Sequence, residues 1–155
     1  MILYLGTSSL IKLYVNEAYS ETIKDWVRAA EIVATSRIAY TEVLSVLDRR
    51  FKNEDLSKNN YDLILNGFSK DWQAFAKVDF DEYEAGDFVN KYGLTRFGAL
   101  HLSSAKLIQK ACKKQKLDFE TLYKKKFNIT LFFSSADEHL CRAATAEGLR
   151  VLSFS

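Results

Sequence analysis

The sequence predicts an α/β fold in which helices cover both faces of a central parallel sheet of four or five strands. Short apolar runs bounded by glycine or polar residues are typical of strands buried on both faces, and Ile2–Leu5 and residues 129–133 are the clearest examples. Longer segments with apolar residues at helical spacing separate these runs. Strands that alternate with helices are joined by right-handed crossovers and therefore form a parallel sheet. We expect one domain over residues 1–155, a length sufficient to bury a core.

Periodicity and turn residues place the individual elements. Ile23, Trp26, Val27 and Ala30 have helical spacing, which predicts a helix over residues 20–30. The same reasoning gives the following order: strand 2–5, a helix capped by Thr7 or Ser8, helix 20–30, strand 32–35, an antiparallel pair of helices over 38–51 and 56–75, strand 76–80, helix 81–92 ending at Gly93, helix 95–116, strand 129–133, helix 137–147 ending at Gly148, and strand 150–154.

Composition excludes several classes of protein. An apolar content of 48% with 27% charged residues is typical of a globular rather than a disordered chain. No run approaches the roughly 20 apolar residues that cross a bilayer, and the N-terminal run lacks the features of a signal peptide. Cys112 and Cys141 have no metal-binding spacing. We therefore expect reduced thiols and a cytoplasmic protein with no membrane contact.

Charge is distributed unevenly along the chain, although the net charge of +2 is too small to imply nucleic-acid binding by itself. Lysines crowd residues 106–126, and acidic residues crowd residues 79–87. Two interpretations remain open at this point: two solvated helix faces, or a flank that contacts phosphates. For the second interpretation the candidate residues are Arg37, Arg96, Lys113 and Lys114.

Four positions distant in the sequence are expected at the same edge of the sheet. Gly6 and Asp137 each follow an apolar strand, whereas Glu42 and Gly98 each stand near the start of a helix. In open parallel sheets, functional sites form beyond the carboxyl ends of the strands, near a switch in strand order. The four segments can therefore converge on one cleft.

The strings around these positions resemble the four signature segments of PIN-domain ribonucleases, the family that includes VapC toxins. They are Leu5-Gly6-Thr7-Ser8, Ile38-Ala39-Tyr40-Thr41-Glu42, Phe97-Gly98-Ala99-Leu100-His101-Leu102 and Ser135-Ala136-Asp137-Glu138-His139-Leu140, in family order. In that family the first and third segments carry aspartate where this chain has Gly6 and Gly98. Glu42 and Asp137 match the second and fourth acids. The resemblance implies a PIN-like fold.

The resemblance also implies catalysis that depends on Mg²⁺ or Mn²⁺, with Glu42 and Asp137 as the remaining catalytic metal ligands. Two such ions within about 4 Å of each other need several carboxylates. Two carboxylates supply a charge of about −2 against the +4 of two ions, so we expect weakened metal binding. Thr7 and Ser135 are candidates to bind water or substrate, with helix capping as an equal interpretation. His101 is expected to be a partly buried, hydrogen-bonded histidine.

Two functions follow from the resemblance. The first is a VapC-type, metal-dependent endoribonuclease by descent whose centre is impaired in this chain by Gly6 and Gly98. The second is a non-catalytic PIN-fold module that binds RNA or a VapB-like antitoxin. The family resemblance also makes a homodimer an expected assembly.

Overall fold

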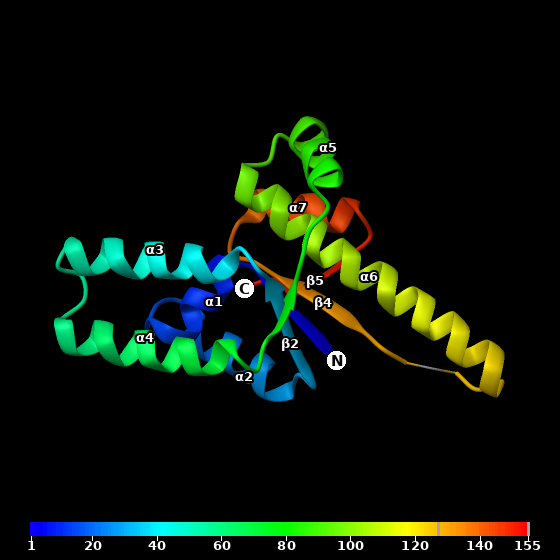
Figure 1. Cartoon of the computed structure of the whole chain (residues 1–155), viewed down its shortest axis with the longest axis horizontal. Coiled ribbons are helices and arrows are strands. Elements are labelled where there is room, and N and C mark those ends of the chain that lie inside the picture. Colours follow the sequence, from blue (N-terminus) through cyan, green and yellow to red (C-terminus); the bar gives the residue numbers. More distant parts are fainter. Residues whose placement is uncertain (127, 155) are drawn as a thin grey trace.

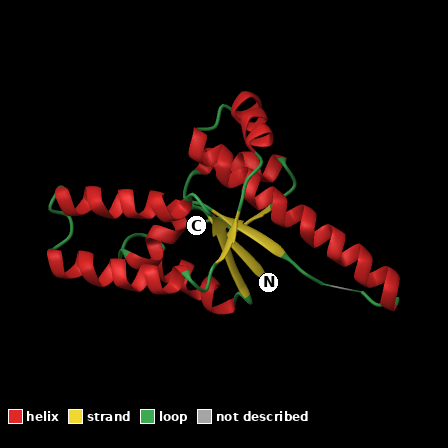
Figure 2. Cartoon of the chain, viewed as in Figure 1, coloured by secondary structure: helices red, strands yellow, loops and turns green. Residues whose placement is uncertain are grey.

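The computed structural model describes residues 1–126 and 128–154, and its centre is a five-stranded parallel sheet with helices on both faces (Figure 1, Figure 2). The strand order is β3-β2-β1-β4-β5, and each neighbouring pair is parallel. In order along the chain, the elements are β1 (Ile2–Leu5), α1 (Thr7–Tyr14), α2 (Ser20–Ala29), β2 (Ile32–Ser36), α3 (Ala39–Lys52), α4 (Lys58–Trp72), β3 (Ala76–Val78), α5 (Glu82–Tyr92), α6 (Arg96–Tyr123), β4 (Leu131–Ser134), α7 (Glu138–Ala146) and β5 (Arg150–Val151). The predicted fold class is confirmed.

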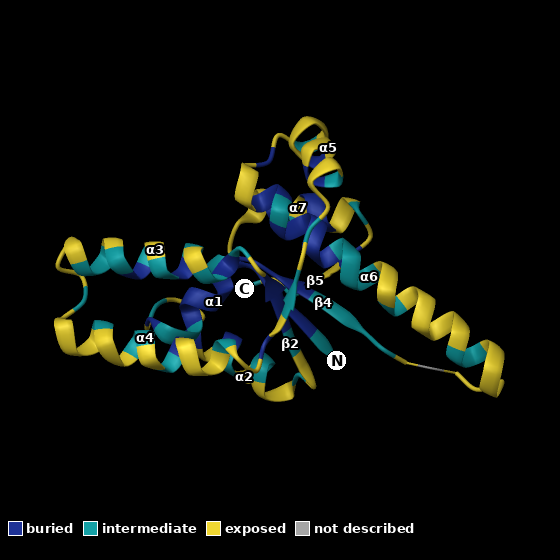
Figure 3. Ribbon diagram, in the orientation of Figure 1, coloured by how far each residue is buried: buried dark blue, intermediate teal, exposed yellow. Residues whose placement is uncertain are grey.

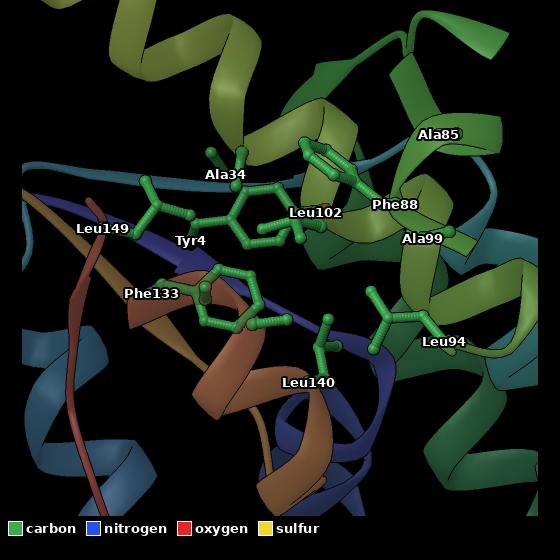
Figure 4. Close-up of a cluster of buried hydrophobic side chains, with 13 residues drawn as sticks. Tyr4, Ala34, Ala85, Phe88, Leu94, Ala99, Leu102, Phe133, Leu140 and Leu149 are labelled. Carbon is green, nitrogen blue, oxygen red and sulfur yellow. The ribbon is translucent and has the colours of Figure 1, made fainter. Parts of the chain in front are cut away.

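Strand β1 lies at the centre of the sheet because its side chains are apolar on both faces. Leu3 and Leu5 pack into one core with α1 to α4, and Tyr4 packs into a second core with α5, α6 and α7. In the second core, the ring of Tyr4 stacks on that of Phe133 at a centroid distance of 5.4 Å, with Leu140 beside them (Figure 4). The sheet is therefore covered on both sides, as Figure 3 shows by its buried central strands.

The strand order changes direction at β1. The chain adds β2 and β3 on one side of β1 and then returns to add β4 and β5 on the other side. A parallel sheet forms a crevice at such a switch, beyond the carboxyl ends of the two strands that flank it. The residues that follow β1 and β4 therefore lie at the position where this fold class places its sites.

Several predicted boundaries differ from the observed ones. Helix α6 continues to Tyr123, seven residues beyond the predicted end at Lys116, and its distal half projects past the sheet (Figure 1). This half exposes Leu117 and Leu122, so it has no buried stripe from which the sequence could reveal its length (Figure 3).

The last strand is shorter than predicted. Strand β5 ends at Val151, although residues up to Phe154 were expected to belong to it. The backbone N–H of Leu152 still donates to the carbonyl of Phe133, but Phe154 instead places its ring between Tyr19 and Trp26. Strand β3 likewise ends at Val78 rather than at Phe80. Among the described residues, no helix is both long enough and apolar enough to span a membrane.

Candidate active site

Gly6 links the central strand to helix α1. Its backbone N–H donates to the carbonyl of Ser134 at 2.9 Å, which joins the carboxyl ends of β1 and β4. Its carbonyl accepts from the N–H groups of Ser9 and Leu10, so Gly6 is the N-cap residue of α1. With no side chain, it offers no side-chain cap to the free N–H groups of this helix.

The prediction that Thr7 or Ser8 caps α1 was wrong. The hydroxyl of Thr7 donates to Oε1 of Glu42 at 2.9 Å, and the hydroxyl of Ser8 lies 3.2 Å from that of Ser135. Both residues already lie within the first turn, so the cap position falls to Gly6. Their hydroxyls are directed instead to partners on other elements.

Glu42 lies in the first turn of α3 and belongs to a buried hydrogen-bonded group that we call the polar corner: Tyr4, Thr7, Glu42 and His101. Oε1 of Glu42 lies 2.9 Å from Nε2 of His101, and Oγ1 of Thr7 lies 2.9 Å from the same nitrogen. Nδ1 of His101 lies 2.7 Å from the hydroxyl of Tyr4. The side chains of His101 and Glu42 are only 4% and 15% exposed, so these contacts replace water.

The carboxylate of Glu42 sets the direction of these hydrogen bonds, because an ionised carboxylate only accepts. Burial raises the pKa of the Tyr4 phenol well above its usual value, so the phenol keeps its proton. Nε2 of His101, which faces that carboxylate, therefore carries a hydrogen, and in a neutral imidazole Nδ1 then accepts from the phenol. Nε2–H donates towards Glu42, whose Oε1 also accepts from Thr7. One carboxylate oxygen therefore has two donors before any ligand arrives.

Asp137 has a structural partner of its own. It is the N-cap residue of α7, and its Oδ1 accepts from the backbone N–H of Leu140 at 3.2 Å. The hydroxyl of Ser135 accepts from the N–H of Asp137 at 3.1 Å, while Ala136 donates its N–H to Ser8. The loop after β4 is thus hydrogen-bonded to the start of α1, and Asp137 is exposed to solvent.

Gly98 lies in the first turn of α6 and is buried. Its N–H donates to Oγ1 of Thr95, the N-cap residue of the helix. A Cβ atom at Gly98 would lie 3.2 Å from that oxygen and 3.9 Å from a methyl group of Leu140. A Cβ atom at Gly6 would have its nearest neighbours at 3.5 Å, in the residues that follow β4. The backbone accepts a side chain at Gly6 with ordinary contacts, whereas at Gly98 Thr95 must move by a few tenths of an ångström.

Comparison with known proteins identifies the fold. A family model described as PIN domain matches residues 3–146. The chain belongs to the PIN-domain family. No curated protein sequence matches it.

Two solved structures share the PIN fold with this chain. One is PAE2754 from Pyrobaculum aerophilum, with a TM-score of 0.61 and 15% identity over 97% of this chain and 89% of that one. The other is FitAcB from Neisseria gonorrhoeae, with a TM-score of 0.60 and 14% identity over 99% of this chain and 97% of that one. At this level of identity, the likeness shows the shared fold alone.

PIN domains generally depend on divalent metal ions, yet the described side chains do not form a complete metal site. Among the described residues, no group of three or more His, Cys, Asp or Glu side chains could hold an ion. Oε1 of Glu42 is occupied by two donors, and Oδ1 of Asp137 caps a helix. At the remaining two family positions, Gly6 and Gly98 supply no side-chain oxygen. A PIN-domain metal centre would need additional ligands here.

The basic residues predicted from the sequence lie in different surroundings. Arg37 pairs with Asp79 at 3.0 Å, and Arg96, two residues before Gly98, stacks over the ring of Phe97. Lys113 and Lys114 lie on the exposed part of α6, about 22 Å along the helix from Gly98.

Sequence reasoning missed one member of the polar corner and the partners of another. Tyr4 was expected only as part of a buried strand, and its hydroxyl is the hydrogen-bond partner of Nδ1 of His101. Tyrosine was the available signal, because a phenol inside an apolar strand must find a hydrogen-bond partner. His101 was expected to be buried and hydrogen-bonded, but its partners were not identified. They come from β1, α1 and α3.

Proposed function

We propose that this PIN-domain protein descends from VapC-type, metal-dependent endoribonucleases and that its active centre is impaired. The observation that carries the proposal is the engagement of Glu42 by Thr7 and His101, in a site that has glycine at two acidic positions of the family. The charge balance supports it, because two carboxylates offer about −2 where two divalent ions bring +4. Under this proposal, Glu42 and Asp137 are what remains of the ligand set for Mg²⁺ or Mn²⁺.

Restoring the two missing acids tests the proposal. A Cβ atom at Gly6 would make ordinary contacts, and one at Gly98 requires only a small movement of Thr95. We expect no cleavage of RNA by the unchanged chain in Mn²⁺. The Gly6→Asp, Gly98→Asp double variant should cleave RNA in Mn²⁺ and lose this activity when EDTA is added.

A matched control separates charge from size. The Gly6→Asn, Gly98→Asn variant adds side chains of the same shape without the carboxylates and should remain inactive. Cleavage by the unchanged chain at the rate of the aspartate variant would contradict the impairment. A folded aspartate variant that neither binds Mn²⁺ in calorimetry nor cleaves RNA would contradict the nuclease descent of the site.

A non-catalytic role is the second candidate function. One observation favours it: a group of cations that have no strong carboxylate partner lies away from the polar corner, along strand β5. Binding of RNA without cleavage would use such a surface. A VapB-like antitoxin and a homodimer are further proposed partners, which co-purification and light scattering of the full chain would reveal.

A further inference from the structure

Two adjoining hollows run along strand β5, and together we call them the β5 groove. The larger has a volume of about 970 Å³, and the smaller has a volume of about 270 Å³. Leu149 and Arg150 line both of them, so the hollows meet at the start of β5. Ser135 and Ala136, which follow β4, also line the larger hollow. The groove therefore begins beside the candidate active site and continues to the flank of α6.

Cations dominate the charge of the β5 groove. Arg142 lines the larger hollow, Lys113 and Lys116 line the smaller one, and Arg150 lines both. Among the described residues, Arg150, Lys113 and Lys116 form no ion pair, and Arg142 meets Glu138 only at 3.9 Å with both side chains largely exposed.

The other charged groups of the groove do not cancel these cations. Glu138 is the single carboxylate residue among the described lining residues. Lys12, at the floor of the larger hollow, is already bound to Glu17 at 3.1 Å and to the carbonyl of Ala18. Four cations with little compensation remain to attract an anionic ligand.

Two aromatic rings, those of Tyr19 and Phe154, line the larger hollow. Tyr19 stacks on Phe154 at a centroid distance of 5.2 Å, and Trp26 also stacks on Phe154, at 5.3 Å. Tyr19 is 44% exposed, and both Tyr19 and Phe154 line the hollow. The ring of Tyr19 is thus held by its neighbour and remains accessible as a flat surface.

We propose that the β5 groove binds single-stranded RNA, with phosphates on Arg142, Arg150, Lys113 and Lys116 and a base on Tyr19. Cationic grooves that combine backbone contacts with aromatic platforms are the general means of binding unpaired strands. A duplex keeps its bases stacked inside and cannot use the tyrosine ring. The choice of RNA as the polymer rests on the proposed function, but binding itself needs neither metal nor cleavage.

The groove differs from the phosphate flank that the sequence indicated. Lys113 lines it, whereas Lys114, Arg37 and Arg96 do not. Arg150 and Arg142 were not singled out, because the sequence spreads them over β5 and α7 rather than over the lysine-rich segment. The tertiary structure brings cations from three elements to one side of the molecule.

Fluorescence anisotropy with a labelled 12-nucleotide single-stranded RNA and the full chain tests this proposal. In the Lys113→Gln, Lys116→Gln, Arg150→Gln variant, affinity at low salt should fall by about tenfold or more. The slope of log affinity against log salt concentration should fall in magnitude by about 2, since each cation on a single strand contributes about 0.7. Tyr19→Ala should weaken binding by about fivefold even at high salt, whereas Tyr19→Phe should not.

The matched control removes the same charge from the α3–α4 arm, which lies on the side of the molecule opposite the projecting end of α6 (Figure 1). The Arg49→Gln, Lys52→Gln, Lys70→Gln variant should change affinity by less than about twofold. Equal losses in the two triple variants would overturn the proposal in favour of diffuse electrostatic attraction.

Three further outcomes would also overturn it. They are no binding of RNA at low salt, equal binding of an RNA duplex of the same length, and an unchanged affinity in the folded β5-groove variant. None of these depends on the cleavage assay of the aspartate double variant. Failure of the groove and failure of the proposed nuclease descent are therefore distinguishable.

Discussion

The polar corner and the β5 groove differ in whether their charged side chains have hydrogen-bond partners within the protein. In the polar corner, Glu42 is almost enclosed and has a donor from each of two other elements, Thr7 and His101. In the groove, Arg150 has no carboxylate partner among the described residues and stays exposed. Buried polar groups contribute to the fold only when they are satisfied, whereas exposed unpaired charges are available to a ligand. The comparison separates a hydrogen-bonded group that supports the fold from an exposed surface whose cations are available to a ligand.

The largest loss of stability is expected when a side chain of the polar corner is removed. His101→Ala removes the donor to Glu42 and the acceptor of Tyr4, and should lower the free energy of unfolding by about 3 kcal/mol. Urea denaturation at neutral pH measures this loss. The exposed His139, which contacts the carbonyl of Tyr92, provides the control, and His139→Ala should cost less than about 1 kcal/mol.

A double-mutant cycle sharpens this prediction. Because Glu42 and His101 are in contact, Glu42→Ala combined with His101→Ala should cost less than the sum of the two single changes. Strict additivity would mean that the polar corner does not act as a unit.

An intermediate loss of stability is expected when Asp137, which is exposed but caps a helix, is replaced. Asp137→Ala should lower the free energy of unfolding by about 1 kcal/mol, because the N–H of Leu140 loses its acceptor. Asp137→Asn keeps a capping oxygen and should stay close to the unchanged protein. An equal loss in both variants would show that the charge, and not the cap, matters at this position.

A smaller loss of thermal stability, which depends on pH, is expected when Glu147 is replaced. The pKa of Glu147 is lowered by the hydrogen bond from Tyr92 and by Lys91, which lies 3.0 Å away. A carboxylate whose pKa falls on folding stabilises the protein above its unfolded pKa of about 4.3, and this contribution is lost as the pH drops through the folded value. Glu147→Gln should therefore melt about 2 °C lower at pH 7, and the difference from the unchanged protein should shrink as the pH falls below the unfolded pKa. Parallel melting curves from pH 7 to pH 3 would contradict the assignment.

The smallest effect on stability is expected in the β5 groove. The Lys113→Gln, Lys116→Gln, Arg150→Gln variant should unfold within about 0.5 kcal/mol of the unchanged protein, because these side chains form no ion pair with any of the described residues. Urea denaturation gives the comparison with His101→Ala directly. A loss above about 1 kcal/mol would show that the groove cations support the fold, and the contrast between the two regions would then fail.

Local patterns predicted much of the fold. The buried run Ile2–Leu5 marked β1, Gly93 marked the end of α5, where its φ is +65°, and Asp137 marked the start of α7. Local patterns failed at two boundaries. Strand β5 ends at Val151, and Phe154 packs against the rings of Tyr19 and Trp26 instead of extending the strand. Helix α6 continues to Tyr123 although its last turns pack against no core among the described residues.

The sequence by itself determined the fold class, and it predicted the four segments of the candidate site that contain Gly6, Glu42, Gly98 and Asp137. These follow from short-range periodicity and from strings of neighbouring residues. Only the tertiary structure decided that Glu42 is held by Thr7 and His101, and that cations from α6, α7 and β5 share one groove. The physical reason is distance along the chain: the partners of Glu42 lie 35 and 59 residues away, and no local pattern encodes which buried donor meets which acceptor.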